Sequence, residues 1–184
     1  MFKKFLTILF IGLLNLNSNA FSDDKILNSL KEGKKLVFIR HALAPGNGDP
    51  NNFDINDCST QRNLDKNGIE QSKRIGLFFK NNKIKIDKVL SSEWCRCKDT
   101  AKYAFKNFET FNALNSFYDA RFAANEAKQI KDLKNYIKNW DDDKNLVLVT
   151  HFVVISSILN TSASSGEIII SDKNLNIIGS VNTM

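Results

Sequence analysis

The stretches Leu36-Val37-Phe38-Ile39-Arg40-His41 and Leu146-Val147-Leu148-Val149-Thr150-His151 decide which fold this sequence predicts. Each places four apolar residues ahead of one polar residue and a histidine, and the 184-residue chain has no other histidine. Short apolar runs are typical of strands buried on both faces of a parallel sheet. Because α/β folds carry their sites at the carboxyl ends of such strands, both imidazoles are expected at one rim. The alternative is that both histidines are purely structural.

Helical and strand-like segments alternate through the rest of the chain. Strands are expected at residues 35–40, 87–91, 110–114 and 146–150, and helices at 23–31, 66–81, 95–107, 126–140 and from 152 onward. Two β-rich runs, 167–171 and 175–181, predict a terminal hairpin. Asp65 is placed to cap the helix at 66–81, whose buried face is expected to hold Ile69, Ile75, Leu77 and Phe78. The predicted fold class is α/β: a single domain with a mostly parallel sheet, helices on both faces and a C-terminal β-hairpin.

Residues 1–20 have the pattern of a secretory signal peptide. A basic start at 1–4, an apolar stretch at 5–14 and a small, polar end before Ala20 follow one another in the usual order. The apolar stretch is too short to favour a stable membrane span. We expect cleavage after Ala20 and an exported domain, periplasmic or secreted, of residues 21–184. A retained anchor is the alternative.

The charge of the chain suits an anionic ligand. The net charge is +6, and removing Lys3 and Lys4 with the leader, which has no acidic residue, leaves +4. The lysines are scattered beside acidic residues and form no single basic stripe, so no nucleic-acid partner is expected.

Three cysteines suggest one disulfide. In an oxidising compartment Cys58 could bridge to Cys95 or Cys97 and hold the long loop at 41–63 against the segment around Arg96. The sequence does not choose the partner, and three free thiols are the alternative. A zinc site is less well supported, because the Cys-x-Cys spacing is short.

Three predicted strand ends bring polar residues to one rim: Arg40-His41, Ser91-Ser92 with Arg96 just beyond, and Thr150-His151. Phosphoryl transfer through a histidine needs such a set. A neutral imidazole nitrogen attacks phosphorus, while guanidinium groups hold the oxygens on which negative charge is concentrated. Arginine suits that task because its planar fork binds two oxygens at once and keeps its proton.

Four segments resemble the signatures of the histidine phosphatase superfamily, which has the phosphoglycerate-mutase-like fold. They are Ile39-Arg40-His41-Ala42, the stretch from Arg62-Asn63-Leu64-Asp65 to Ser72, the stretch from Ser91-Ser92-Glu93-Trp94 to Ala101, and Val149-Thr150-His151. They occur in the family's order and span most of the predicted mature chain. The sequence is most similar to the small exported bacterial branch, not to the large acid phosphatases and phytases.

The resemblance implies a role for each matching residue. His41 would be the nucleophile that becomes phosphohistidine, Arg40 and Arg96 would clamp the phosphoryl group, and His151 would donate hydrogen bonds to the transferring oxygens. No metal or cofactor is implied, because the arginines already supply the charge neutralisation. The substrates consistent with this are a phosphorylated small molecule, a glycan or a phosphoprotein.

Four further positions match the pattern less closely. Arg62 matches a position at the pocket edge, with a surface salt bridge as the alternative. Ser92 lies at the substrate-binding rim, where its hydroxyl is better suited to capping the following helix than to catalysis. Ala42 replaces the family's usual glycine, which matters only if the backbone there needs positive φ or close approach. Phe152 replaces the usual glycine or aspartate after the second histidine and excludes the phytase-like proton donor.

No glutamate occupies the position from which mutase-type members take their general acid. Asp119 and Glu126 are the candidates, with solvent exposure or helix capping as the alternative for both. A missing acid costs about a hundred- to ten-thousand-fold for a poor leaving group and less for a good one, such as phosphohistidine, an acyl phosphate or an aryl phosphate. We therefore expect a phosphohydrolase, a phosphomonoesterase or phosphohistidine phosphatase, and no mutase activity.

Other functional classes fit less well. A cysteine-dependent phosphatase needs Cys, five residues and Arg, a spacing that no cysteine here has. No Gly-x-Ser-x-Gly elbow of a serine hydrolase occurs, and Gly46-Asn47-Gly48 lacks the ending of a phosphate loop. The serious competitor is a non-catalytic phosphate-binding module on the same fold.

Overall fold

The computed structural model describes residues 18–184, and their side chains from residue 24. Most of the predicted signal segment therefore lies outside the described residues. Helix α1 (Ser18–Glu32) begins five residues earlier than predicted and includes the predicted cleavage position. No helix in the described part of the chain is long and apolar enough to cross a membrane.

Six strands form one sheet in the order β3-β2-β4-β1-β5-β6. The strands are β1 (Leu36–Arg40), β2 (Ile86–Ser91), β3 (Glu109–Thr110), β4 (Asn145–Thr150), β5 (Ile168–Ser171) and β6 (Ile177–Val181). The four strands from β3 to β1 run parallel, and β5 and β6 are antiparallel to their neighbours. The predicted class, a mostly parallel α/β sheet with a C-terminal hairpin, is confirmed.

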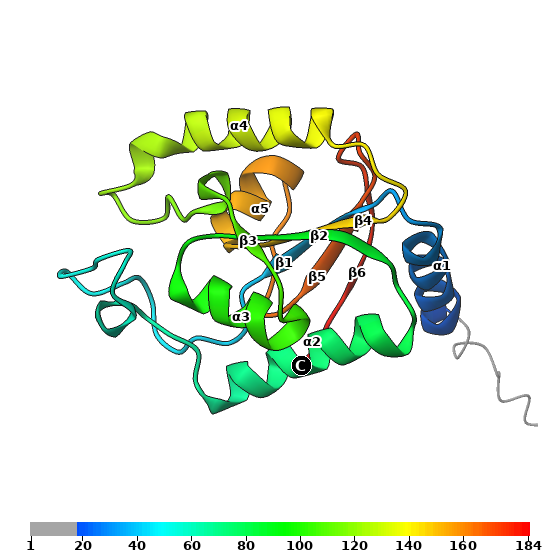
Figure 1. The fold of residues 1–184 in the computed structure, drawn as a ribbon, viewed down its shortest axis with the longest axis horizontal. Coiled ribbons are helices and arrows are strands. Elements are labelled where there is room, and N and C mark those ends of the chain that lie inside the picture. Colours follow the sequence, from blue (N-terminus) through cyan, green and yellow to red (C-terminus); the bar gives the residue numbers. More distant parts are fainter. Residues whose placement is uncertain (1–17) are drawn as a thin grey trace, which may run out of the picture.

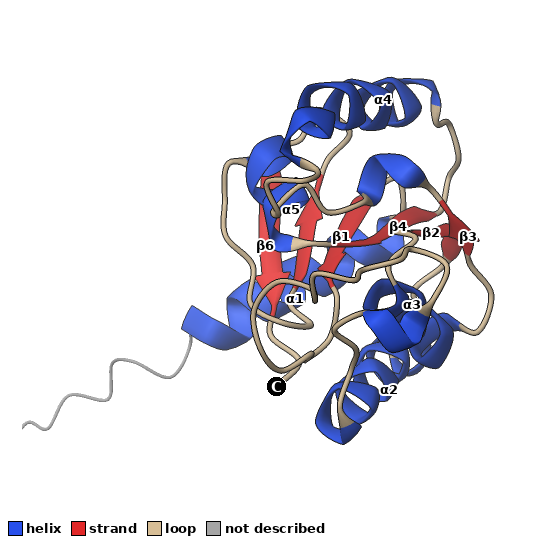
Figure 2. Ribbon diagram, turned by 90° about the vertical axis from the view of Figure 1, so that its left-hand side faces the viewer, coloured by secondary structure: helices blue, strands red, loops and turns tan. Residues whose placement is uncertain are grey.

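Helices cover both faces of the sheet (Figures 1 and 2). They are α2 (Lys66–Asn81), α3 (Cys95–Phe105), α4 (Glu126–Asn139) and α5 (Phe152–Leu159). In β1, Leu36 and Phe38 join the core beneath α4 and α5, whereas Val37 and Ile39 join the core shared with α1, α2 and α3. This alternation is the two-residue period of a strand buried on both faces, and it explains why the run is apolar throughout.

Two local predictions are wrong in detail. The strand expected at 110–114 is shorter than predicted, because β3 ends at Thr110. A 3-10 helix (Asn112–Leu114) follows it and places Leu114 in the core. In α2, Leu77 is 51% exposed, and Phe79 takes the buried position in its place. Phe79 lies four residues after the buried Ile75 and so shares its face, whereas Leu77 lies two residues after it and points away. Asp65 caps α2 as predicted, accepting from the Gly68 N–H at 2.8 Å.

Candidate active site

The two histidines meet at the carboxyl end of the parallel strands, where the sequence places them. Arg40 pairs with Thr150 in the register of β1 and β4, and the His41 N–H donates to the Thr150 carbonyl at 2.9 Å. The rings of His41 and His151 are 5.5 Å apart between centroids, and each residue is only 2% exposed. Two residues that are far apart in the chain thus share one buried neighbourhood.

The hydrogen bond of His41 determines which nitrogen carries the proton. Nδ1 lies 2.8 Å from the carbonyl oxygen of Ala42. A carbonyl only accepts, so Nδ1 is the protonated nitrogen and Nε2 keeps its lone pair. Burial, and then the positive charge of Arg96, holds the pKa of His41 well below its ordinary value. His41 is therefore neutral at physiological pH, the form that a nucleophile requires.

The second histidine is held by Ser92. The Ser92 hydroxyl donates to Asn115 Oδ1 at 3.0 Å, so it accepts from His151 Nε2, which lies 2.9 Å away. Burial and the charge of Arg96 also hold the pKa of His151 well below its usual range. The capping role predicted for Ser92 is confirmed in part: Trp94 is the N-cap residue of α3 and makes no side-chain cap bond, but the Ser92 hydroxyl accepts from the Trp94 N–H at 3.2 Å. Ser92 also orients His151.

Arg96 is buried, and Arg40 is half-buried. Arg40 donates through Nη1 to the Ala163 carbonyl at 2.8 Å, and its guanidinium carbon lies 5.3 Å from the centroid of the Phe152 ring. Arg96 is 3% exposed. The Nε–H groups of both arginines are buried and have no hydrogen-bond partner among the described residues. A buried unpaired donor is costly, so each such group calls for an explanation such as a bound anion.

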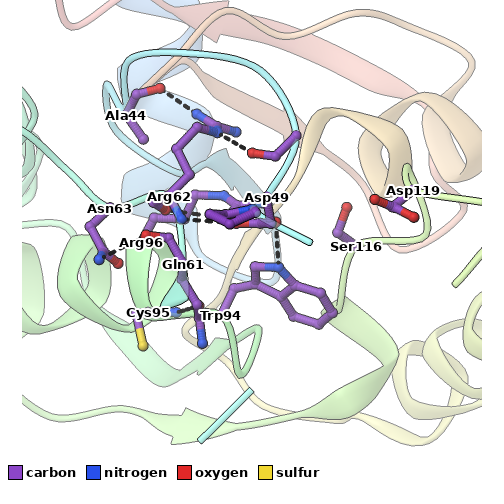
Figure 3. Close-up of polar contacts among 12 residues, drawn as sticks. Ala44, Asp49, Gln61, Arg62, Asn63, Trp94, Cys95, Arg96, Ser116 and Asp119 are labelled. Atoms are coloured by element: carbon purple, nitrogen blue, oxygen red, sulfur yellow. Dashed lines mark hydrogen bonds and ion pairs between the residues drawn. The ribbon is translucent and has the colours of Figure 1, made fainter. Parts of the chain in front are cut away.

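Asp49 occupies the ends of the Arg96 guanidinium, a contact that the sequence analysis missed. Its carboxylate accepts from Arg96 Nη1 at 2.8 Å and Nη2 at 3.2 Å, from Trp94 Nε1 at 3.0 Å and from the Arg62 backbone N–H at 3.0 Å. Figure 3 shows the carboxylate between Arg96 and the indole. Burial alone would raise the pKa of Asp49, but the hydrogen bonds and charge of Arg96 outweigh it and lower the pKa. The only available signal was one of three aspartates in the loop at 41–63, next to Gly48 and Pro50.

Arg62 lies at the pocket edge and makes no salt bridge with any described residue. Its Nε donates to the Gly48 carbonyl at 2.9 Å, and its Nη1 donates to the Ala44 carbonyl. Burial and the neighbouring Arg96 lower its pKa. Arg62 therefore shapes the loop that carries Asp49.

A disulfide fastens this loop to α3. Cys58 pairs with Cys95, which confirms the predicted bridge and selects its partner. Beside it, the Gln61 side chain accepts from the Cys95 N–H at 2.9 Å. The third cysteine, Cys97, is a buried free thiol, and burial raises its pKa to about 12. Its sulfur lies 3.4 Å from His151 Nε2, so it contributes to the packing beneath the site and not to its reactivity.

The departure at Ala42 is accommodated by the backbone. Ala42 is fully buried, is not among the residues with positive φ, and donates its N–H to Thr100 Oγ1 at 3.0 Å. Glycine is required instead at Gly166, whose N–H lies 3.1 Å from the carbonyls of both Arg40 and His41. The φ of Gly166 is +73°, and an added Cβ would lie 2.3 Å from Gln71 Nε2.

A small pocket of about 60 Å³ is lined by the three arginines of this region but by neither histidine. It is lined by Arg40, Gly46, Asn47, Gly48, Asp49, Arg62, Trp94, Arg96, Ser116, Tyr118, Asp119, Phe122 and Phe152. One ordered water needs about 10–15 Å³ on this scale, so the pocket holds roughly four to six water-sized groups, about the size of a phosphoryl group. Arginines and aromatic rings dominate the lining.

Neither acid candidate is suited to donate a proton. Asp119 lines the pocket, but its hydrogen bonds to Arg121 lower its pKa to about 2. It is therefore ionised at neutral pH. Glu126 does not line this pocket; its carboxylate accepts from the Ser157 hydroxyl at the edge of α4. Among the described residues, no group of three or more His, Cys, Asp or Glu side chains could hold a metal ion.

The fold has well-matched solved relatives, although no protein-family model matches the sequence and no curated protein matches it significantly. The protein histidine phosphatase SixA in complex with tungstate superposes with a TM-score of 0.59 over 81% of this chain and 97% of that one, at 16% identity. A mycobacterial glucosyl-3-phosphoglycerate phosphatase in complex with VO3 gives 0.54 over 75% and 92%, at 15% identity.

A phosphoglycerate mutase from Thermus thermophilus gives a TM-score of 0.57 over 80% of this chain and 98% of that one, at 12% identity. The chain has the histidine phosphatase fold. The match covers nearly the whole of each relative, and at these identities it establishes the fold that the sequence motifs predicted.

Proposed function

We propose that this protein is a phosphohydrolase, a phosphomonoesterase or phosphohistidine phosphatase, that forms a covalent phosphohistidine on His41. The observation that carries the proposal is the pairing of two neutral imidazoles, 5.5 Å apart, whose chain neighbours Arg40 and Phe152 line a phosphoryl-sized pocket together with Arg62 and Arg96. Solved proteins of the same fold include named phosphatases, two of them in complex with the oxyanions tungstate and VO3.

In the first step, His41 Nε2 attacks phosphorus and the bond to the leaving group breaks. The Nδ1 hydrogen bond to the Ala42 carbonyl keeps the lone pair on Nε2 and stabilises the positive charge that develops on the ring as the new bond forms. In the second step, water attacks the phosphohistidine and releases inorganic phosphate. Because burial keeps His41 neutral, it is competent for the first step without a separate base.

The arginines supply charge neutralisation. Arg40 and Arg96 each carry a buried Nε–H with no partner in the described part of the chain, and a phosphoryl oxygen would satisfy both donors. Losing one preorganised donor of this kind costs about a hundred- to thousand-fold in rate. The pKa of His151 is lowered first by burial and then by the charge of Arg96. We assign His151 the donation of a hydrogen bond to the transferring oxygens.

We also propose that the protein is exported. The signal-like sequence at 1–20 supports this, and so does the Cys58–Cys95 disulfide, because disulfides persist mainly in oxidising compartments.

The test is steady-state hydrolysis of p-nitrophenyl phosphate by the full chain. We expect turnover in the wild type and in Asp132→Asn, an exposed-site control on α4, and none in His41→Ala with its circular dichroism unchanged. Phosphate binding without turnover in the wild type would instead support the non-catalytic binding module. Turnover that persists in His41→Ala would refute the proposed nucleophile.

A further inference from the structure

The mouth of the pocket carries two exposed aromatic rings. Tyr118 is 48% exposed and Phe152 is 36% exposed, and both line the pocket that Arg40 and Arg96 line. Their ring centroids are 5.4 Å apart, in an edge-to-face arrangement. Two exposed rings in contact form a contiguous apolar surface, and such a surface beside a pocket is typical of a ligand-binding site.

Neighbouring polar groups hold both rings in place. The Asn47 side-chain amide donates to the Tyr118 hydroxyl at 3.3 Å, from the loop that follows His41. Phe152 directly follows His151 in sequence and packs against the Arg40 guanidinium at 5.3 Å. The pocket has room for little more than a phosphoryl group. The rest of a bound substrate must therefore lie at the mouth, where these rings are.

The carboxylates near the pocket indicate which leaving groups can depart. Asp119 is held ionised by Arg121, and Asp49 is held ionised by Arg96, so neither can protonate a leaving oxygen. Without a proton donor the oxygen leaves as an anion. An aliphatic alkoxide resembles hydroxide, whose conjugate acid has a pKa of about 15.7, whereas a phenol has a pKa of about 10. The site favours a phenolate leaving group.

We infer that Tyr118 and Phe152 form a leaving-group subsite for the planar ring of an aryl phosphate monoester. The inference rests on the proposed function. The bond between His41 Nε2 and phosphorus forms as the bond from phosphorus to the aryl oxygen breaks. The phenolate leaves with the electron pair and takes its proton from water. A second water then displaces phosphate from His41, so the products are a phenol and inorganic phosphate, with no oxidation or reduction.

The binding test uses two phosphonates that cannot be hydrolysed. Phenylphosphonate and methylphosphonate are compared as ligands of the full chain by isothermal titration calorimetry. We expect tighter binding of phenylphosphonate, and a preference that falls about two- to tenfold in Tyr118→Ala and in Phe152→Ala, the range of one aromatic contact. Tyr103→Ala is the matched control, because Tyr103 is 40% exposed on α3 and does not line the pocket; its preference should equal the wild-type value.

Because Phe152 also packs against Arg40, Phe152→Ala could weaken all anions alike. The ratio of the two phosphonates is insensitive to that effect and is therefore the deciding quantity. Equal binding of both phosphonates by the wild type, or an unchanged ratio in both variants, overturns the inference. A preference that persists in a protein without any turnover would support the subsite and refute the proposed function, so the two failures are distinguishable.

The turnover test distinguishes a small-molecule aryl phosphate from a phosphotyrosine-containing protein as the substrate. Phenyl phosphate, a phosphotyrosine peptide, a phosphoserine peptide and a phosphohistidine peptide are compared by kcat/KM. We expect both aryl esters to exceed the phosphoserine peptide, and this margin to shrink in Tyr118→Ala and Phe152→Ala but not in Tyr103→Ala. Higher kcat/KM for phenyl phosphate than for the phosphotyrosine peptide would indicate a small-molecule source. A phosphohistidine peptide as the best substrate would contradict the aryl-ester inference.

Discussion

Replacing Asp49 by asparagine should destabilise the protein by about 3 kcal/mol at pH 7. The carboxylate satisfies four N–H donors, two of them on Arg96, and the side chains of Arg96 and Asp49 are 4% and 8% exposed. Removing one partner of a buried ion pair costs about 3–5 kcal/mol, because the other charge stays buried without compensation. Asparagine keeps one acceptor oxygen, which places the expected cost at the lower end.

Urea denaturation of both proteins measures this difference directly. Asp132→Asn is the matched control, since Asp132 pairs with Lys128 on the exposed face of α4; it should cost less than about 0.5 kcal/mol. The pKa of Asp49 is lowered in the folded protein. Its contribution is therefore complete above the unfolded pKa of about 3.9 and is lost as the pH falls through the folded value. A cost for Asp49→Asn no larger than that of the control would refute the structural role assigned to Asp49.

Three further predictions concern the site and its loop. Folded His41 and His151 stay neutral below pH 6.5 while the same histidines of the unfolded chain gain protons, so the free energy of unfolding falls by up to about 2 kcal/mol per histidine at pH 5. Urea denaturation at pH 5 and 7.5 should show a smaller fall in the double variant His41→Asn/His151→Asn than in the wild type. An equal fall in both proteins would contradict this prediction. The Cys58–Cys95 bridge joins residues 37 positions apart, so its loss should lower the free energy of unfolding by up to about 4 kcal/mol in the chain-entropy model. Urea denaturation of Cys58→Ala and of the oxidised wild type measures this difference, and equal stabilities would count against the bridge. Ser92→Ala removes the hydrogen-bond partner of His151 Nε2. It should lower kcat roughly fivefold, equivalent to about 1 kcal/mol, and leave KM unchanged. A change in KM alone would rule out a positioning role for Ser92.

The strand ends could be predicted from the sequence, whereas the loop contacts could not. The apolar runs before His41 and His151 identify buried parallel strands, and parallel strands bring their carboxyl ends to one rim. That rule places Arg40 and both histidines without any knowledge of the loops. The spacing of apolar residues and the capping residue Asp65 predict helix α2 in the same way. Leu77 is exposed because its angular position on the helix points away from the buried face, which its apolar character alone does not reveal.

Asp49 shows why the remainder was missed. It lies 47 positions before Arg96, in an irregular segment whose path depends on the disulfide, on Gln61 and on carbonyl contacts of Arg62. No periodicity encodes such a path. Tyr118 likewise reaches the pocket from an irregular segment. The charge balance of the site therefore depends on contacts that strand and helix patterns do not predict.

The most direct test of the central claim is to trap the phosphoenzyme. The full chain is mixed with ³²P-labelled phenyl phosphate, quenched without acid, and digested for peptide mapping. We expect an acid-labile, base-stable label on the peptide containing His41, absent from a folded His41→Ala variant. An acid-stable label, or a label on a serine or cysteine peptide, would contradict it.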